Sequence, residues 1–250
     1  MSGDPRRAVA ADPPALHARG VVKRFGARTA LAGLDLQVPG GASFALVGAN
    51  GAGKTTLIKC LLDLSRPESG TIELFGVPSC EAEARARIAY LPERFTPPHY
   101  LLGREFLALI GQLTGARIDP ERRAQLCAEL GLEPAALERP VRQLSKGMTQ
   151  KLGLIACLLV ERDLYVLDEP LDGLDPASRA AVKAALARLT AQHRTLFLTS
   201  HVLADVAELC SAMGVIERGR MLFHGTPAEL RERHPGTDLE QAFIHCVRGS

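Results

Sequence analysis

Hydrophobic and polar positions divide the chain into three stretches of different periodicity. In the first, from residue 15 to about 91, short apolar runs are separated by turn residues such as those at 39–41 and 67–70. Apolar runs bounded by proline and glycine are typical of β-strands. We therefore expect strands at 34–38, Ser43–Val47, 71–75 and Ile88–Leu91.

The second and third stretches differ from the first in the length and spacing of their apolar positions. From about 93 to 154, apolar residues recur at helical spacing, for example over 104–113 and 121–130. Beyond residue 160 strands and helices alternate, because a strand is expected at 164–167, a helix at 177–189, a strand at Thr195–Thr199 and a helix from Leu203. This alternation predicts a parallel sheet covered by helices, with the helical stretch inserted as a lobe.

Composition narrows the class of protein. Of 250 residues, 46% are hydrophobic and 23% charged, which excludes a disordered chain. The 30 basic and 28 acidic residues give a net charge of +2, which argues against a strongly electrostatic nucleic-acid binder. The longest apolar run, 152–160, is about half the length that a membrane span requires. The six cysteines show no zinc or redox spacing, and residues 1–14 lack the apolar core of a secretory signal, so we expect a loose N-terminal tail and a cytoplasmic protein.

A glycine-rich loop follows the strand Ser43–Val47 and precedes a helical run at 55–62. Its sequence fits the phosphate-binding pattern G-x-x-x-x-G-K-[ST], known as Walker A. In this pattern backbone N–H groups converge on phosphates, the lysine reaches the β- and γ-phosphates and the following hydroxyl ligates Mg²⁺. The candidate nucleotide-binding residues are Gly48, Ala49, Asn50, Gly51, Ala52, Gly53, Lys54, Thr55 and Thr56.

Two carboxylates end the apolar strand at 164–167. Ligands in open parallel sheets bind beyond the carboxyl ends of the strands, so both side chains are expected to face the phosphate site. Asp168 is a candidate Mg²⁺ ligand, and Glu169 is placed to take a proton from an attacking water. The alternative is a strand that merely ends in two solvated acids.

Three further elements carry a family resemblance: the sequence LSKGMTQ at 144–150, DGLDP at 172–176 and His201 after the strand Thr195–Thr199. Together with the loop and the acidic pair, in this order, they resemble the ATP-binding subunits of ABC transporters over about residues 15–230. The resemblance implies an α/β fold: a P-loop NTPase core with a mostly parallel sheet, an N-terminal antiparallel β subdomain and a helical subdomain at about 93–154. Residues 15–235 would form this ATPase domain, and 236–250 a short C-terminal segment.

The resemblance also assigns roles to individual residues. It implies that Phe25 stacks on adenine, that His201 acts in catalysis and contacts the γ-phosphate, and that 90–93 form the Q-loop. It places 172–175 in the D-loop. The signature motif, which contacts the nucleotide, would consist of Ser145, Lys146, Gly147 and Met148. Taken alone, Ser145 is more often a helix N-cap, His201 a hydrogen-bonded residue at a strand end, and Phe25 a packed or half-exposed aromatic.

Three positions depart from the usual family motifs. Lys146 replaces a glycine of the signature, Met148 replaces its glutamine, and Glu93 replaces the glutamine of the Q-loop. Glu93 remains a candidate Mg²⁺ ligand through its carboxylate oxygen. The sequences LSKGM and LPE are similar to those of the ATPases of type-2 ABC exporters.

The partners follow from the same resemblance. It implies a homodimer arranged head to tail around two ATP molecules, bound to an integral membrane permease on the cytoplasmic face of the membrane, with neither nucleic acid nor direct membrane insertion. Phe95, Tyr100 and Phe106 would line the groove that receives the permease, or else pack inside the helical lobe. The alternative function is a soluble ABC-type ATPase that acts on nucleic acid or on a protein assembly.

Overall fold

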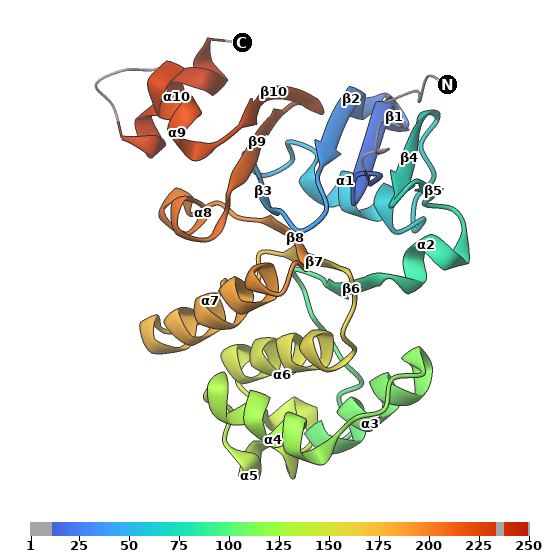
Figure 1. The fold of residues 1–250 in the computed structure, drawn as a ribbon, viewed down its shortest axis with the longest axis vertical. Helices are drawn as coiled ribbons and strands as arrows, with labels where there is room; N and C mark the ends of the chain where they lie inside the picture. Colours follow the sequence, from blue (N-terminus) through green and yellow to red (C-terminus); the bar gives the residue numbers. More distant parts are fainter. Residues whose placement is uncertain (1–11, 234–237, 250) are drawn as a thin grey trace, which may run out of the picture.

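The computed structural model describes residues 12–233 and 238–249. Most of the tail expected at 1–14, and part of the C-terminal segment expected at 236–250, therefore lie outside the described residues. Figure 1 shows the β-rich part of the chain in its upper half and a group of helices in its lower half. The described residues include no helix that is both long enough and apolar enough to span a membrane.

An antiparallel sheet is built from the first strands of the chain. Its order is β2-β1-β4-β5. The bounds are β1 Leu16–Phe25, β2 Arg28–Val38, β4 Ser69–Leu74 and β5 Val77–Pro78. The expected strand at 71–75 ends one residue early, because Phe75 has a φ of 50°, outside the range of a strand.

The second sheet is six-stranded, with the order β10-β9-β3-β8-β7-β6. All its neighbouring strands run parallel except β10, which pairs antiparallel with β9. The bounds are β3 Ser43–Val47, β6 Ile88–Leu91, β7 Leu164–Asp168, β8 Thr195–Thr199, β9 Ala212–Glu217 and β10 Arg220–Gly225. Every residue of β3, β7 and β8 is buried, as expected for central strands of a sheet covered on both faces.

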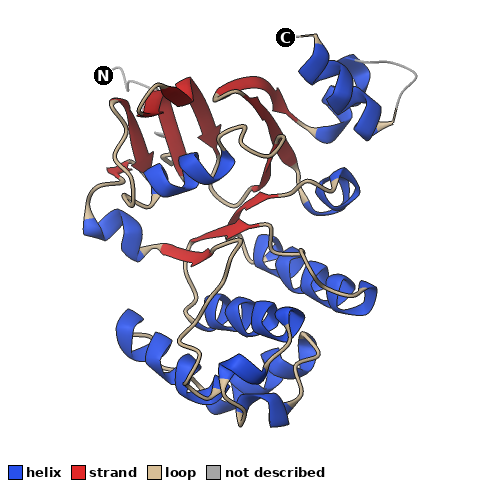
Figure 2. Cartoon of the chain, turned by 180° about the vertical axis from the view of Figure 1, so that it is seen from behind, coloured by secondary structure: helices blue, strands red, loops and turns tan. Residues whose placement is uncertain are grey.

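Helices cover the parallel sheet and form the lower lobe, as Figure 2 shows from behind. Their bounds are α1 Lys54–Leu61, α2 Ala82–Ala86, α3 Gly103–Thr114, α4 Pro120–Glu129, α5 Pro134–Leu137, η1 Val141–Gln143, α6 Lys146–Leu159, α7 Pro176–Ala191, α8 Leu203–Leu209, α9 Pro227–Arg233 and α10 Leu239–Arg248. The mostly parallel sheet, the N-terminal antiparallel sheet and the inserted helices confirm the predicted α/β fold class.

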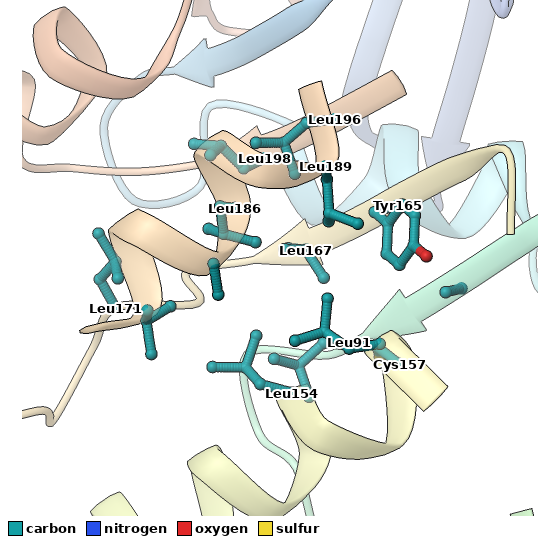
Figure 3. Packing of buried hydrophobic residues seen from close by; sticks show 14 of the residues in the cluster. Leu91, Leu154, Cys157, Tyr165, Leu167, Leu171, Leu186, Leu189, Leu196 and Leu198 are labelled. Carbon is teal, nitrogen blue, oxygen red and sulfur yellow. The ribbon is translucent and has the colours of Figure 1, made fainter. Parts of the chain in front are cut away.

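The larger core cluster joins the helical lobe to the parallel sheet. Figure 3 shows Leu154 and Cys157 of α6 facing Leu91 and Leu167 of the sheet. Phe106 is only 4% exposed, and its ring packs edge-on against that of Phe95 with the centroids 5.6 Å apart. Phe95 and Phe106 therefore pack inside the helical lobe, which is the second of the two alternatives given for them above. Tyr100, in contrast, is exposed.

Candidate nucleotide site

The phosphate-binding loop connects the end of β3 to the start of α1. Lys54 is the first residue of this helix, and Gly53 before it has a φ of 123°, which residues with a side chain rarely adopt. The Lys54 ammonium is buried and donates to the backbone oxygens of Gly48 at 2.6 Å and Ala49 at 3.4 Å. The loop thus curls around a lysine held by neutral carbonyls, at a helix N-terminus that favours anions.

Asp168 is the last residue of β7 and is almost completely buried. Its Oδ2 accepts a hydrogen bond of 3.3 Å from the Thr55 hydroxyl, and its Oδ1 accepts one of 2.6 Å from the Thr199 hydroxyl. Burial raises the pKa of this carboxyl above its ordinary value, while the hydrogen bond from Thr199 opposes that shift. A cation bound nearby would stabilise the charged form of this buried carboxylate.

Glu169, the next residue, lies beside His201. Its φ of 51° lies in the left-handed region, where non-glycine residues are uncommon, and its backbone N–H donates to the Thr199 hydroxyl at 2.9 Å. The His201 ring nitrogen Nδ1 lies 2.9 Å from Glu169 Oε2, and the His201 backbone N–H donates to the same oxygen at 3.3 Å. A carboxylate and a histidine are therefore paired at the open end of the sheet.

One cavity of about 760 Å³ contains these groups, a size that suits a nucleotide. Phe25 and Glu93 also lie in its wall, so the structure brings together residues that are far apart in the sequence. Of the phosphate-loop residues, Ala52 is buried and does not line the cavity. The lining is Phe25, Arg28, Ala30, Gly48, Ala49, Asn50, Gly51, Gly53, Lys54, Thr55, Thr56, Glu93, Asp168, Glu169, Asp172 and His201.

The candidate signature residues 145–148 are not part of this wall. Ser145 is the N-cap of α6, and its hydroxyl accepts a hydrogen bond from the backbone N–H of Met148. In this single chain the serine therefore acts as a helix cap. The Lys146 ammonium donates to Asp172 at 2.7 Å. This hydrogen bond is the main reason that the pKa of Asp172 lies below its ordinary value. Lys146 itself does not line the cavity, but the side chain that it bonds, Asp172, does.

Sequence analysis did not identify Arg28, Asp172 or Thr199 as residues of the site. The family resemblance assigns Asp172 only to the D-loop. Thr199 is the last residue of β8 and bonds both acidic residues through its hydroxyl. Thr199 could have been found from the sequence only if the pairing of β7 with β8 had been known, because that pairing brings the end of β8 next to the two acidic residues.

The oxygen donors of the site suit Mg²⁺. Thr55, Asp168 and Glu93 offer a hydroxyl and carboxylates, the hard ligands that this ion prefers, and Asp168 is buried with an oxygen directed toward Thr55. The described residues contain no group of three or more His, Cys, Asp or Glu side chains that could hold a metal ion. A hydroxyl and two carboxylates leave coordination positions of Mg²⁺ for phosphate and water, the arrangement that this ion usually adopts at nucleotide sites.

Comparison with known proteins shows the family of the chain. The sequence profile described as "ABC transporter" matches residues 31–172, which include the phosphate-binding loop and the acidic pair. The chain belongs to the ABC transporter ATP-binding family. The resemblance inferred from the sequence is therefore confirmed.

Two relatives and one solved structure illustrate the match. An uncharacterised ABC transporter ATP-binding protein of Synechocystis sp. is 37% identical over 82% of this chain, and the match spans 59% of that relative's length. Nod factor export ATP-binding protein I of Burkholderia lata is 37% identical over 90% of this chain and 75% of its own length. A structure described as the ATP-binding subunit of an ABC transporter is 28% identical, with a TM-score of 0.84 over 92% of this chain and 98% of that one.

Proposed function

We propose that this chain is a Mg²⁺-dependent ATPase subunit that dimerises around two ATP molecules and drives a separate membrane permease, in the direction of export. The observation that carries the ATPase part is the convergence of Lys54, Asp168, Glu169 and His201 on one cavity. Family membership supports ATP as the nucleotide. The Nod factor export relative supports export by a type-2 system.

Within the cavity each residue type has a defined task. The Phe25 ring, 53% exposed, stacks on the adenine, while the backbone N–H groups of 48–56 and Lys54 bind the phosphates. Thr55, Asp168 and Glu93 would hold Mg²⁺, which would supply charge neutralisation for the phosphates.

The hydrolytic step is assigned to the paired residues at the open end of the sheet. Glu169 accepts a proton from the water that attacks the γ-phosphorus as the bond to the ADP oxygen breaks. His201 fixes the orientation of this carboxylate through the 2.9 Å contact. The family resemblance assigns it a contact to the γ-phosphate as well. The products are ADP and inorganic phosphate.

The dimer follows from what one chain leaves incomplete. The signature residues Ser145, Lys146, Gly147 and Met148 lie outside the wall of their own cavity, so we assign them to the ATP of a second copy. Donors at the N-terminus of α6 and the Lys146 ammonium then stabilise the negative charge of the γ-phosphate in trans. ATP joins the two copies, and its hydrolysis removes that link.

Purification of the chain from membranes tests the transport role. We expect an affinity-tagged chain, extracted with mild detergent from its native membranes, to copurify with a polytopic membrane protein and to be peripheral on the cytoplasmic face. Mg²⁺-ATP hydrolysis should persist in the complex. Purification without such a protein, together with stimulation of hydrolysis by DNA or RNA, would instead support the soluble ATPase alternative.

A further inference from the structure

Arg28 begins β2 directly opposite Phe25. The two residues are register partners across the turn at Gly26–Ala27, and both line the nucleotide cavity. This hairpin places Arg28 opposite the residue whose ring is expected to stack on adenine, while the cation over that ring is Lys23, whose Nζ lies 5.2 Å from the ring centroid. Arg28 is therefore positioned at the base end of the cavity, on a rigid antiparallel pair rather than on a long loop.

The Arg28 guanidinium contacts the phosphate-binding loop. Its Nη2 donates to the backbone oxygen of Gly51 at 3.2 Å. Other arginines of the same sheet pair with carboxylates: Arg24 with Glu68 and Arg19 with Glu73. Among the described residues, no carboxylate pairs with Arg28. Its side chain is exposed and its charge is held only by a neutral carbonyl.

The charges around the cavity leave a role for this arginine. Lys54, at the start of α1, donates to the backbone oxygens of Gly48 and Ala49, which directly follow β3. Carboxylates dominate the remaining wall, at Glu93, Asp168, Glu169 and Asp172. ATP and ADP are polyanions, and a cation in the wall between the base and Lys54 would add a counter-charge for the phosphate nearest the ribose. Among the described residues that line the cavity, the arginines and lysines are Arg28 and Lys54.

We infer that Arg28 binds the nucleotide, by donating to the phosphate next to the ribose while Phe25 stacks on the base. This inference rests on the proposed ATP site and adds a specific contact to it. Arginine suits such a contact because its planar group donates more than one hydrogen bond to phosphate oxygens. A contact at the ribose end is common to ADP and ATP, so it contributes equally to both.

Displacement of a fluorescent trinitrophenyl-ATP by unlabelled ADP tests the inference. ADP is used because it lacks the γ-phosphate that the signature of a second copy is expected to contact. Arg28→Ala should weaken ADP and ATP binding by the same factor, about three- to tenfold, as expected for one partly exposed charged contact. Arg28→Lys should recover part of the loss. Arg24→Ala is the matched control, an exposed arginine of the same hairpin that does not line the cavity.

The outcomes separate the inference from the proposed function. If the wild-type chain binds neither nucleotide, the ATP site itself is refuted. If the wild type binds both and Arg28→Ala matches Arg24→Ala, the site stands and the role of Arg28 is refuted. A loss for ATP much larger than for ADP also refutes a contact at the ribose end. Melting temperatures of all variants should agree, because the substituted side chains are exposed.

Discussion

Thr199 connects the two acidic residues of the site, so we predict that Thr199→Val affects both stability and turnover. Its hydroxyl is fully buried, donates to Asp168 at 2.6 Å and accepts from the Glu169 backbone N–H at 2.9 Å. Valine has nearly the same shape but removes both hydrogen bonds. A buried polar group left without a partner costs about 1–3 kcal/mol, and more when it is charged. We therefore expect the free energy of unfolding to fall by about 3 kcal/mol.

Urea unfolding followed by far-ultraviolet circular dichroism measures this change, since the chain contains no tryptophan for a fluorescence assay. Turnover of ATP should fall at least about tenfold, because a displacement of catalytic groups by about 1 Å has effects of that size or larger. Thr199→Ser keeps the hydroxyl and should retain most of the activity.

A matched control lies at the other end of the same strand. The Thr195 hydroxyl is also buried, and it accepts a hydrogen bond of 2.9 Å from the Gly41 N–H, away from the cavity. Thr195→Val should lower stability without lowering the turnover of the folded protein. If Thr199→Val unfolds within about 0.5 kcal/mol of the wild type and hydrolyses ATP at the same rate, the role given to this hydroxyl is wrong.

Two further predictions concern lysines. Lys54→Ala should weaken nucleotide binding more than about tenfold, because a buried counter-charge is removed. Lys59→Ala, on the exposed side of α1, is the control and should not weaken binding. Equal affinities of the two variants in a displacement titration would contradict this prediction. Lys146→Ala should leave the melting temperature nearly unchanged, because its exposed ion pair with Asp172 contributes at most about 1 kcal/mol to stability. The same variant should reduce ATP-dependent dimerisation. Undiminished dimerisation in size-exclusion chromatography would show that Lys146 does not contact the ATP of the second copy.

Local patterns in the sequence were sufficient for the elements that frame the site. The strand Ser43–Val47 was predicted with its observed bounds, because a short apolar run is bounded by turn residues on one side and the glycine-rich loop on the other. The position of Asp168 at the end of a buried strand followed in the same way. Both predictions depend on residues that are close together in the chain.

Contacts between distant segments were not predictable in this way. Arg28 reaches Gly51 because a hairpin folds over the loop, and Thr199 reaches Asp168 because β7 and β8 pair in a particular register. The ion pair of Lys146 and Asp172 similarly depends on where α6 begins relative to the D-loop. No local pattern specifies such pairings, so the sequence identified the chemistry of the site but not its full hydrogen-bond network.

The Glu169→Gln variant tests the central proposal most directly, because it removes the proton acceptor while preserving the shape of the side chain. We expect this variant to bind Mg²⁺-ATP with wild-type affinity, to lose nearly all hydrolysis in a phosphate-release assay, and to accumulate as an ATP-dependent dimer in size-exclusion chromatography. Wild-type turnover together with a monomer at saturating ATP would contradict both the role of Glu169 and the shared site.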